Sequence, residues 1–477
     1  MNTSLEQDLT QLFEQWSGER AQHFSPLPPS GSYREYYRIR GEQQSALGVY
    51  NQDRKENIAF LTFSKYFHHQ GLSVPEIYVE DLDHHLYLLQ DLGDTTLFSY
   101  LTDVRKNGSF PDELVRCYRQ VLEELPRFQI LSGEKLNYAV CYPRAQFDKQ
   151  SMLWDLNYFK YYFLKLAKIA FDEQALEDDF QTLTSYLLQA DCHYFLYRDF
   201  QSRNIMLCQE KPYFIDYQGG RRGALQYDLA SLLYDAKADI PQAIRLELFD
   251  YYIEVISQFI PLDRQTFQEL YYGYVLIRMM QAMGAFGFRG FYEKKEHFLQ
   301  SVPYAIKNIE WLLEAVQLPI NIPEITQVLN QLVDSETLKN LGNTHPTLTV
   351  CINSFSYRRG IPIDESGQGG GYVFDCRTIH NPGRYDRYKH LTGKDAAVVE
   401  FFQQETDVES YLQHIYALVD HSVETFQQRN LRQLMVSFGC TGGQHRSVYC
   451  AERLAEHLPK TRDVKIVLRH VEQEMKG

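Results

Sequence analysis

The sequence predicts two structural units: an α+β unit that combines a small β-rich lobe with a larger helical lobe, then an α/β unit with a parallel or mixed sheet. Three patterns support this fold class. Short β-rich runs separated by turns fill residues 31–90. Helical periodicity dominates from residue 112 to about residue 330, with one strand–loop–strand segment at 194–217. Beyond a polar segment at 334–346, strand and helix patterns alternate, which is typical of a sheet covered by helices.

The domain boundaries follow from these changes of pattern. We expect a first unit over 1–333, divided into a β-rich lobe at about 20–92 and a helical lobe at about 93–333, then a linker over 334–345 and a second unit over 346–477. The chain carries a net charge of −14, yet residues 344–477 contain 16 Lys+Arg and 16 Asp+Glu. The excess negative charge therefore lies in the first unit, which indicates that the two units have different partners.

Composition excludes several classes of protein. No stretch reaches 18 consecutive apolar residues, and the N-terminal residues lack the basic and apolar regions of a signal peptide. The eight cysteines are scattered without a CxxC pair, as expected for reduced thiols and not for a disulfide framework or a zinc site. We therefore expect a cytoplasmic protein that does not bind membranes. Its negative charge argues against broad nucleic-acid binding.

The strongest chemical signal is the stretch "FLYRDFQSRNIMLCQEKPYFIDYQ". Asp199 and Asn204 lie five residues apart in a loop after an apolar run, and Asp216 follows 12 residues later at the end of another apolar strand. Phosphoryl transfer from ATP requires one carboxylate to accept the proton of the attacking hydroxyl. It also requires an amide and a second carboxylate to hold Mg²⁺ against the nucleotide phosphates. Asp199 or Asn204 alone is more simply explained as a turn cap, but the three residues together favour a phosphotransferase site.

Several motifs of the first unit resemble a known superfamily. The segments "GSYREYYRI", "LLQDLGDTTL", "MLWDLNYFKYYFL", "YRDFQSRNIML" and "IDYQGGRRGALQYDLASLLYD" resemble aminoglycoside phosphotransferases and choline kinases, and most closely the bacterial anomeric kinases of N-acetylmuramate and N-acetylglucosamine. The resemblance covers about residues 10–330. It implies a protein-kinase-like bilobal α+β domain, ATP and Mg²⁺ as cofactors, and a small amino sugar as the acceptor, phosphorylated at C1.

The resemblance also implies roles for individual residues. Asp199 would be the catalytic base, Asn204 and Asp216 the Mg²⁺ ligands, and Asp228 a structural support of the catalytic loop. The hinge facing adenine would consist of Gln90, Asp91 and Leu92, and the residues over the phosphates would be Ser32, Arg34 and Arg38. For the two arginines, an exposed strand position is an equal alternative.

This sequence departs from the family pattern in three places. Tyr197 replaces the usual His two positions before the base, "DYQ" replaces a "DFG"-like triplet, and no lysine occupies the expected third strand. On the acceptor side, Asp155 and Arg222 are candidates to hydrogen-bond a sugar hydroxyl or carboxylate, with helix surface charge as the alternative.

In the second unit, an apolar strand leads through "GCTGGQHRS" into a helix that we expect to begin near His445. Backbone N–H groups at such a turn form an anion site, Gly442 and Gly443 permit close approach, and His445 and Arg446 add charge. The five-residue interval between Cys440 and Arg446 is also that of a cysteine phosphatase loop, in which the helix N-terminus would lower the pKa of the thiol. A small buried residue at the strand end is the alternative for Cys440.

The blocks "CINSFSYRRGIPIDE", "YVFDCRTIHNPGRYDRYKHLTGKD" and "GCTGGQHRSV" resemble the C-terminal domain of the RNase adapter protein RapZ over residues 346–477. This resemblance implies binding of a phosphorylated amino sugar, glucosamine-6-phosphate, through the loop residues Cys440, Thr441, Gly442, Gly443, His445, Arg446 and Ser447. It also implies RNA binding, against which the net charge of about zero argues. The Walker-A motif of that family's N-terminal half does not occur in this chain.

Two hypotheses for the function follow. The first is an ATP-dependent amino-sugar kinase of cell-wall or amino-sugar metabolism, whose second unit binds a phosphorylated amino sugar. The alternative is a regulatory adapter with an inactive kinase half, which binds RNA or a protein.

Overall fold

The computed structural model describes residues 3–28, 34–105, 109–209, 211–341, 348–362, 371–405, 407–428, 431 and 433–474. The chain divides into two compact units, Met1–Gly342 and Asn343–Gly477. Within the described ranges, no helix is long and apolar enough to cross a membrane.

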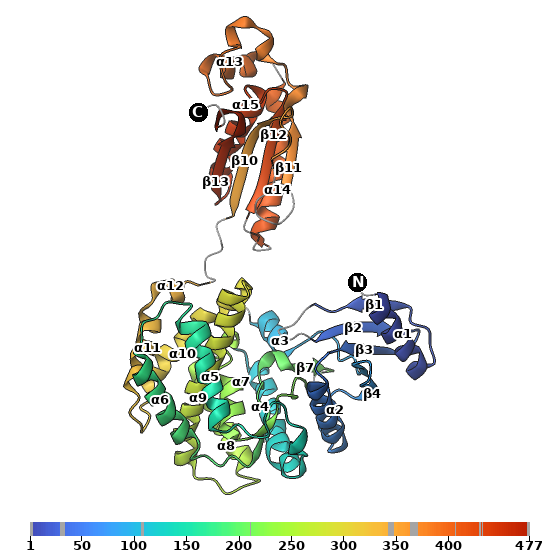
Figure 1. Ribbon diagram of the computed structural model, residues 1–477, viewed down its shortest axis with the longest axis vertical. Helices are drawn as coiled ribbons and strands as arrows, with labels where there is room; N and C mark the ends of the chain where they lie inside the picture. Colours follow the sequence, from blue (N-terminus) through green and yellow to red (C-terminus); the bar gives the residue numbers. More distant parts are fainter. Residues whose placement is uncertain are drawn as a thin grey trace. The chain divides into compact units, whose positions relative to one another are not determined.

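The N-terminal lobe of the first unit contains a five-stranded antiparallel sheet with strand order β1-β2-β3-β5-β4 (Figure 1). Its strands are β1 (His23–Pro26), β2 (Glu35–Arg40), β3 (Ser45–Tyr50), β4 (Ile77–Asp81) and β5 (Leu86–Leu89). Helix α1 (Thr3–Ser17) buries Leu9 and Phe13 against Ile39 and Leu88 of the sheet. Helix α2 (Arg54–His69) packs with Val49 and other side chains of the main core of this unit.

Helix α2 begins where the sequence places a capping residue. The side chain of Asp53 accepts hydrogen bonds from the backbone N–H groups of Lys55 and Glu56, which satisfies two of the unpaired donors of the first turn. The helix ends before Gly71, whose φ of +74° favours glycine, as is common just after a helix. The cap determines the position of Glu56, a half-buried carboxylate in the first turn.

The second lobe of the first unit is helical. Its helices are α3 (Leu97–Val104), α4 (Asp112–Pro126), α5 (Lys149–Phe159), α6 (Glu173–Leu187), α7 (Leu225–Leu233), α8 (Gln242–Ile256), α9 (Arg264–Gly287), α10 (Val302–Ala315), α11 (Pro323–Asp334) and α12 (Glu336–Lys339). Helix α9 contacts α5 and α7, and its buried face joins the apolar core that α2 also enters. One continuous core therefore holds the two lobes together.

Two short antiparallel ribbons interrupt the helices at the predicted strand–loop–strand segment. The first pairs β6 (Tyr194–Leu196) with β9 (Arg221–Gly223), and the second pairs β7 (Ile205–Cys208) with β8 (Lys211–Phe214). The turns that follow β6 and β8 contain Asp199 and Asp216, so these ribbons position the candidate catalytic residues.

The first unit extends into part of the predicted linker 334–345. Helix α12 lies in that segment, and Leu338 is buried in the core of the first unit. Leu338, an apolar side chain in a mostly polar segment, packs α12 against this core. The remaining linker residues, 342–345, lie outside the described ranges.

The second unit contains a four-stranded sheet with order β11-β12-β10-β13, and all three of its strand pairings are parallel. The strands are β10 (Thr349–Ser356), β11 (Gly371–Asp375), β12 (Gln433–Cys440) and β13 (Lys465–His470), and the helices are α13 (Ala396–Glu405), α14 (Val408–Gln428), α15 (Arg446–Thr461) and α16 (Val471–Glu474). Helix α15 packs against β10, β12 and β13. The predicted choice between a parallel and a mixed sheet is thus resolved as parallel.

Candidate active site

The segment that ends in Asp199 is held by one buried side chain. After β6, the chain turns at Arg198, whose φ is +85°, a strained conformation for a residue other than glycine. The carboxylate of Asp228 accepts hydrogen bonds from the backbone N–H of Tyr197 at 2.8 Å and from that of Arg198 at 3.0 Å. These bonds fix the backbone immediately before Asp199.

Asp228 lies in the first turn of α7 and is fully buried. The amide nitrogen of Gln129 donates to the same carboxylate at 3.0 Å, and the hydroxyl of Tyr252 orients Gln129 with a hydrogen bond of 2.6 Å. Burial raises the pKa of Asp228 to about 7, although the three donors act in the opposite direction. The geometry fits the supporting role that the family resemblance implies for this residue.

Asp199, Asn204 and Asp216, which the sequence separates by up to 17 positions, converge in the structure. The amide nitrogen of Asn204 donates to the backbone carbonyl of Asp199 at 2.8 Å and to the carboxylate of Asp216 at 3.1 Å. The second carboxylate oxygen of Asp216 accepts a hydrogen bond of 2.6 Å from the amide of Gln218. The three predicted residues thus form one hydrogen-bonded group.

Electrostatics favour a cation between the two aspartates. Burial raises the pKa of Asp216, and the like charge of Asp199 raises it further, while the hydrogen bond from Gln218 and the charge of Arg34 lower it. No group of three or more His, Cys, Asp or Glu side chains in the described ranges forms a metal cage. One carboxylate with one amide oxygen instead suits Mg²⁺, which is commonly shared with nucleotide phosphates.

Two departures from the family pattern have structural explanations. Tyr197, which replaces the usual His, is fully buried and donates its hydroxyl to the carbonyl of Ile215 at 2.7 Å, so it ties the loop of Asp199 to the strand end at Asp216. Tyr217, in the "DYQ" triplet, stacks on Phe60 of α2 with 5.4 Å between ring centroids. Its hydroxyl lies 2.7 Å from that of Ser64, also on α2. Tyr217 therefore connects helix α2 to the strand end that contains Asp216.

Arg34 supplies a buried positive charge near Asp216. Its Nη2 lies 3.0 Å from the carboxylate of Glu56 on α2, and its guanidinium lies over the ring of Phe60. In protein kinases the corresponding pair is a strand lysine with a helix glutamate. The sequence indicated Arg34 but not Glu56, because only the structure brings the first turn of α2 to this arginine. Ser32 lies outside the described ranges.

Arg38 lies elsewhere. Its guanidinium contacts the carboxylate of Asp91 at 2.7 Å and that of Asp94 at 2.8 Å, so it ties β2 to the segment after β5 and is not turned toward Asp216. That segment includes the predicted hinge residues Gln90 and Leu92, and it joins the sheet to the helical lobe. The N–H of Gln90 donates to Glu76 at 2.9 Å, and Leu92 is buried. Arg38 and Asp91 thus form part of the hinge structure, contrary to the phosphate contact expected for Arg38.

Asp155 contacts the catalytic loop and not open space. Both of its carboxylate oxygens accept hydrogen bonds from Arg198, at 2.7 and 2.6 Å, and Tyr227 is the third partner of this guanidinium at 2.5 Å. Both carboxylate oxygens of Asp155 already bind Arg198. In the structure Asp155 therefore holds Arg198 in position and does not make the sugar contact that was expected. The sequence contained the relevant signal in the triplet "YRD", where Arg198 immediately precedes Asp199.

The two arginines of β9 face opposite ways, as successive residues of a strand do. Arg222, the predicted substrate ligand, lies over the ring of Tyr138 at 4.2 Å. It lines a pocket of about 330 Å³ together with Gln146, Phe147, Asp148, Leu188, Cys192 and His193. Its neighbour Arg221 is buried, and its Nε donates to the carbonyl of Gly219 at 2.9 Å. Of the two, Arg221 is the arginine beside Asp199, because Gly219 lies against the Asp199 carboxylate.

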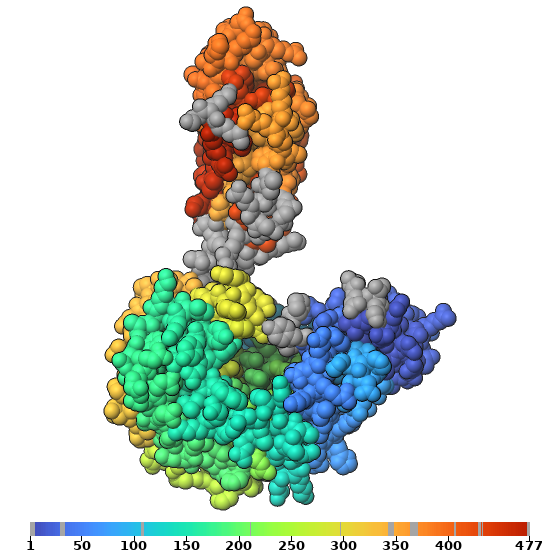
Figure 2. All heavy atoms as spheres, viewed as in Figure 1, coloured from blue at the N-terminus to red at the C-terminus, as the bar shows by residue number. Residues whose placement is uncertain are grey.

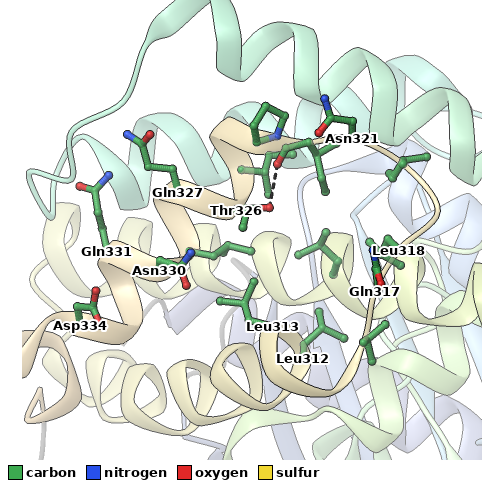
Figure 3. Close-up of a pocket in the computed structure, with 17 residues that line it drawn as sticks. Leu312, Leu313, Gln317, Leu318, Asn321, Thr326, Gln327, Asn330, Gln331 and Asp334 are labelled. Atoms are coloured by element: carbon green, nitrogen blue, oxygen red, sulfur yellow. Dashed lines mark hydrogen bonds between the residues drawn. The ribbon is translucent and has the colours of Figure 1, made fainter.

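The surface of the first unit is hollowed between its two lobes (Figure 2). The floor of the hollow is green in that view, the colour of the middle of the chain. A separate pocket of about 730 Å³ lies between α9, α10 and α11 (Figure 3). Its walls include Leu312, Leu313 and Leu318, and its lining includes no residue of the Asp199 group.

In the second unit, the predicted loop joins β12 to α15 through Cys440 and Gly443. The thiol of Cys440 lies 3.2 Å from the hydroxyl of Ser447, and it accepts a hydrogen bond of 3.2 Å from the N–H of Gly443, whose φ is +63°. Burial raises the pKa of this thiol, but the bonds from Ser447 and Gly443 and the charge of Arg446 outweigh burial and leave it below its usual value. Cys440 is 3% exposed, so its thiol is a poor nucleophile for an external substrate.

The charged side chains of the loop already make hydrogen bonds to backbone carbonyls of neighbouring turns. Nη1 of Arg446 donates to the carbonyls of Arg377 and Ile379, at 3.0 and 3.1 Å, and Nε2 of His445 lies 2.8 Å from the carbonyl of Tyr388. Both residues therefore anchor neighbouring turns. Thr441 and Gly442 are the exposed part of the loop.

Both units match models of known protein families. Residues 24–262 match the model of the phosphotransferase enzyme family, which is half of the chain, and residues 348–474 match that of the RapZ C-terminal domain. The chain belongs to the phosphotransferase enzyme family.

Among curated relatives, a nucleotide-binding protein of Hahella chejuensis is 34% identical over 174 residues, which are 36% of this chain and 59% of that protein. A nucleotide-binding protein of Methylococcus capsulatus is 39% identical over 125 residues, 26% of this chain and 40% of that protein. The matched region thus spans about half the length of these relatives.

Among solved structures, a choline/ethanolamine kinase family protein from Mesorhizobium loti is 12% identical with a TM-score of 0.45, and the match covers 70% of this chain and all of that one. A spectinomycin phosphotransferase in complex with ADP and spectinomycin is 13% identical with a TM-score of 0.44, over 68% of this chain and 98% of that one.

The supporting role of Asp228 is testable by Asp228→Asn. An asparagine has one acceptor oxygen in place of two, so at least one of the three donors from Tyr197, Arg198 and Gln129 loses its partner. We expect the free energy of unfolding to fall by about 1–3 kcal/mol, measured by urea denaturation. The control Asp178→Asn removes an exposed carboxylate on α6 and should change stability little. Equal stability of the two variants would contradict the proposed role of Asp228.

Proposed function

We propose that this chain is an ATP-dependent phosphotransferase that phosphorylates a hydroxyl of an amino sugar similar to N-acetylmuramate or N-acetylglucosamine, with C1 as the acceptor position. The observation that carries the proposal is the convergence of Asp199, Asn204 and Asp216 through the hydrogen bonds of Asn204. Membership of the phosphotransferase family supports the reaction class. The choice of sugar rests on the motif resemblance of the first unit.

The residues of the site suggest a division of labour in phosphoryl transfer. The half-buried carboxylate of Asp199 would accept the proton of the acceptor hydroxyl as its oxygen attacks the γ-phosphorus and ADP departs. The oxygen of Asn204 and the carboxylate of Asp216 would hold Mg²⁺, which supplies charge neutralisation for the phosphates when bound. Arg34, held by Glu56 within the electrostatic reach of Asp216, would contact the nucleotide phosphates.

The second unit would bind a phosphorylated amino sugar. Its match to the RapZ C-terminal domain supports this proposal, as does the exposed backbone at Thr441 and Gly442 beside the start of α15. Since His445 and one nitrogen of Arg446 are engaged by backbone carbonyls, the proposed phosphate contacts come mainly from backbone N–H groups of the loop. Binding there would couple the kinase to the level of a pathway metabolite.

The catalytic proposal is tested by Asp199→Asn. Because an amide cannot accept the hydroxyl proton, we expect kcat for sugar phosphorylation to fall about 10²–10⁴-fold with little change in the KM for ATP. Sugar-dependent ADP release measures both constants. Asp178→Asn, which removes an exposed carboxylate, serves as the matched control. A wild-type protein without ATP-dependent sugar phosphorylation would instead favour the regulatory adapter with an inactive kinase half.

The phosphosugar proposal is tested by titration of the full chain with glucosamine-6-phosphate. We expect a saturable rise in the melting temperature of the wild-type protein, since a ligand that binds only the folded state stabilises it. Gly443→Ala should abolish the rise, because a methyl group there would lie 2.3 Å from Cγ of Glu472 and the φ of +63° disfavours alanine. The melting temperature of the variant without ligand shows whether it folds. An equal shift with glucosamine, which lacks the phosphate, would contradict phosphate recognition.

A further inference from the structure

Arg221 is a buried cation without an ion-pair partner. It is 7% exposed, and within the described ranges it makes one hydrogen bond, from Nε to the carbonyl of Gly219 at 2.9 Å, and no contact with a carboxylate at ion-pair distance. Its terminal nitrogens make no hydrogen bond within the described ranges and are not completely buried. Burial lowers the pKa of this guanidinium, and the neighbouring charge of Arg198 lowers it further. A buried charge in this state is costly unless an anion arrives to pair with it.

The position of Arg221 is next to the candidate base. Its anchor, Gly219, lies so close to Asp199 that a Cβ atom placed on it would be 3.7 Å from the carboxylate oxygen Oδ2. The guanidinium is thus held by the residue that lies next to the carboxylate of Asp199. Arg222, the neighbouring residue, is turned to the other face of β9 and lies over Tyr138.

Arg221 and Arg34 come from different lobes of the first unit. Arg221 belongs to β9, which pairs with β6 among the helices of the second lobe. Arg34 instead pairs with Glu56 on α2 of the N-terminal lobe. With the nucleotide phosphates assigned to Arg34, Arg221 is the arginine available to an acceptor beside Asp199.

Arg198 does not compete for an anion beside Asp199. Its guanidinium already binds both oxygens of Asp155 and the hydroxyl of Tyr227. Arg221 retains free N–H donors in the planar fork that suits bidentate binding of a carboxylate. An anionic group that approaches Asp199 would therefore pair with Arg221.

We propose that Arg221 selects an acceptor that carries a carboxylate in addition to the phosphorylated hydroxyl, by pairing with that carboxylate beside Asp199. The inference rests on the proposed kinase function and extends it to the substrate class. Of the two sugars named above, it favours N-acetylmuramate, whose lactyl ether carries a carboxylate, over N-acetylglucosamine, which has a free hydroxyl in place of that ether.

The experiment compares these two sugars as acceptors for wild type, Arg221→Gln and Arg221→Lys. For the wild type we expect kcat/KM at least 10-fold higher with the carboxylate sugar. Arg221→Gln should remove this preference through a rise of about 10–100-fold in the KM for that sugar, with the KM for ATP and the kinetics of the neutral sugar within a few-fold of wild type. Arg221→Lys keeps the positive charge but loses the two parallel N–H donors of the guanidinium. Its preference for the carboxylate sugar should lie between those of the wild type and Arg221→Gln. The control Arg264→Gln removes an exposed arginine and should retain the preference.

Three results would overturn the inference. They are a wild-type preference for the neutral sugar, an equal loss with both sugars in Arg221→Gln, and a raised KM for ATP in that variant, which would place Arg221 at the transferred phosphate. Melting temperatures show whether the variants fold. Calorimetric titration of the carboxylate sugar in the presence of ADP and Mg²⁺ separates this inference from the kinase proposal. Binding to wild type and not to Arg221→Gln supports the role of Arg221 even if no phosphoryl transfer is observed, and absence of binding to wild type contradicts it.

Discussion

The buried carboxylate of Asp228 accepts hydrogen bonds from two consecutive backbone N–H groups, those of Tyr197 and Arg198, and so determines where Asp199 lies. A carboxylate without water around it must find donors within the protein, because an unpaired buried charge is costly. Gln129 and, behind it, Tyr252 provide the remaining partner and its orientation. The helix that contains Asp228, the loop that contains Asp199 and the helix that contains Tyr252 are therefore connected by one polar network inside an apolar core.

The hydrogen bonds of this site compensate for its strained backbone. Arg198 and Asp216 both have positive φ values, +85° and +70°, which residues other than glycine adopt only when their surroundings compensate. At Arg198 the compensation comes from Asp228 on the backbone and from Asp155 and Tyr227 on the side chain. At Asp216 it comes from Asn204 and Gln218. The result is that Asn204 joins the backbone of Asp199 to the carboxylate of Asp216.

The sequence predicted the architecture and the convergence of three polar residues well, because both depend on local patterns. Strand and helix periodicity identified the two lobes and the alternating second unit, and the spacing of Asp199, Asn204 and Asp216 identified this group of three. The roles of individual charged residues were less predictable, because each depends on a tertiary partner far away in the chain. Arg38 forms ion pairs with Asp91 and Asp94, and Asp155 forms one with Arg198. Arg34 forms an ion pair with Glu56, whose position depends on the cap of α2.

The central claim is that the Asp199 group transfers phosphate from ATP to a sugar hydroxyl. The most direct measurement is phosphorus NMR of the full chain with ATP, Mg²⁺ and each member of a panel of amino sugars. The account predicts a new sugar-phosphate resonance that grows together with ADP and, for phosphorylation at C1, couples to the anomeric proton. Conversion of ATP only to ADP and inorganic phosphate, or no change with any sugar, would contradict it.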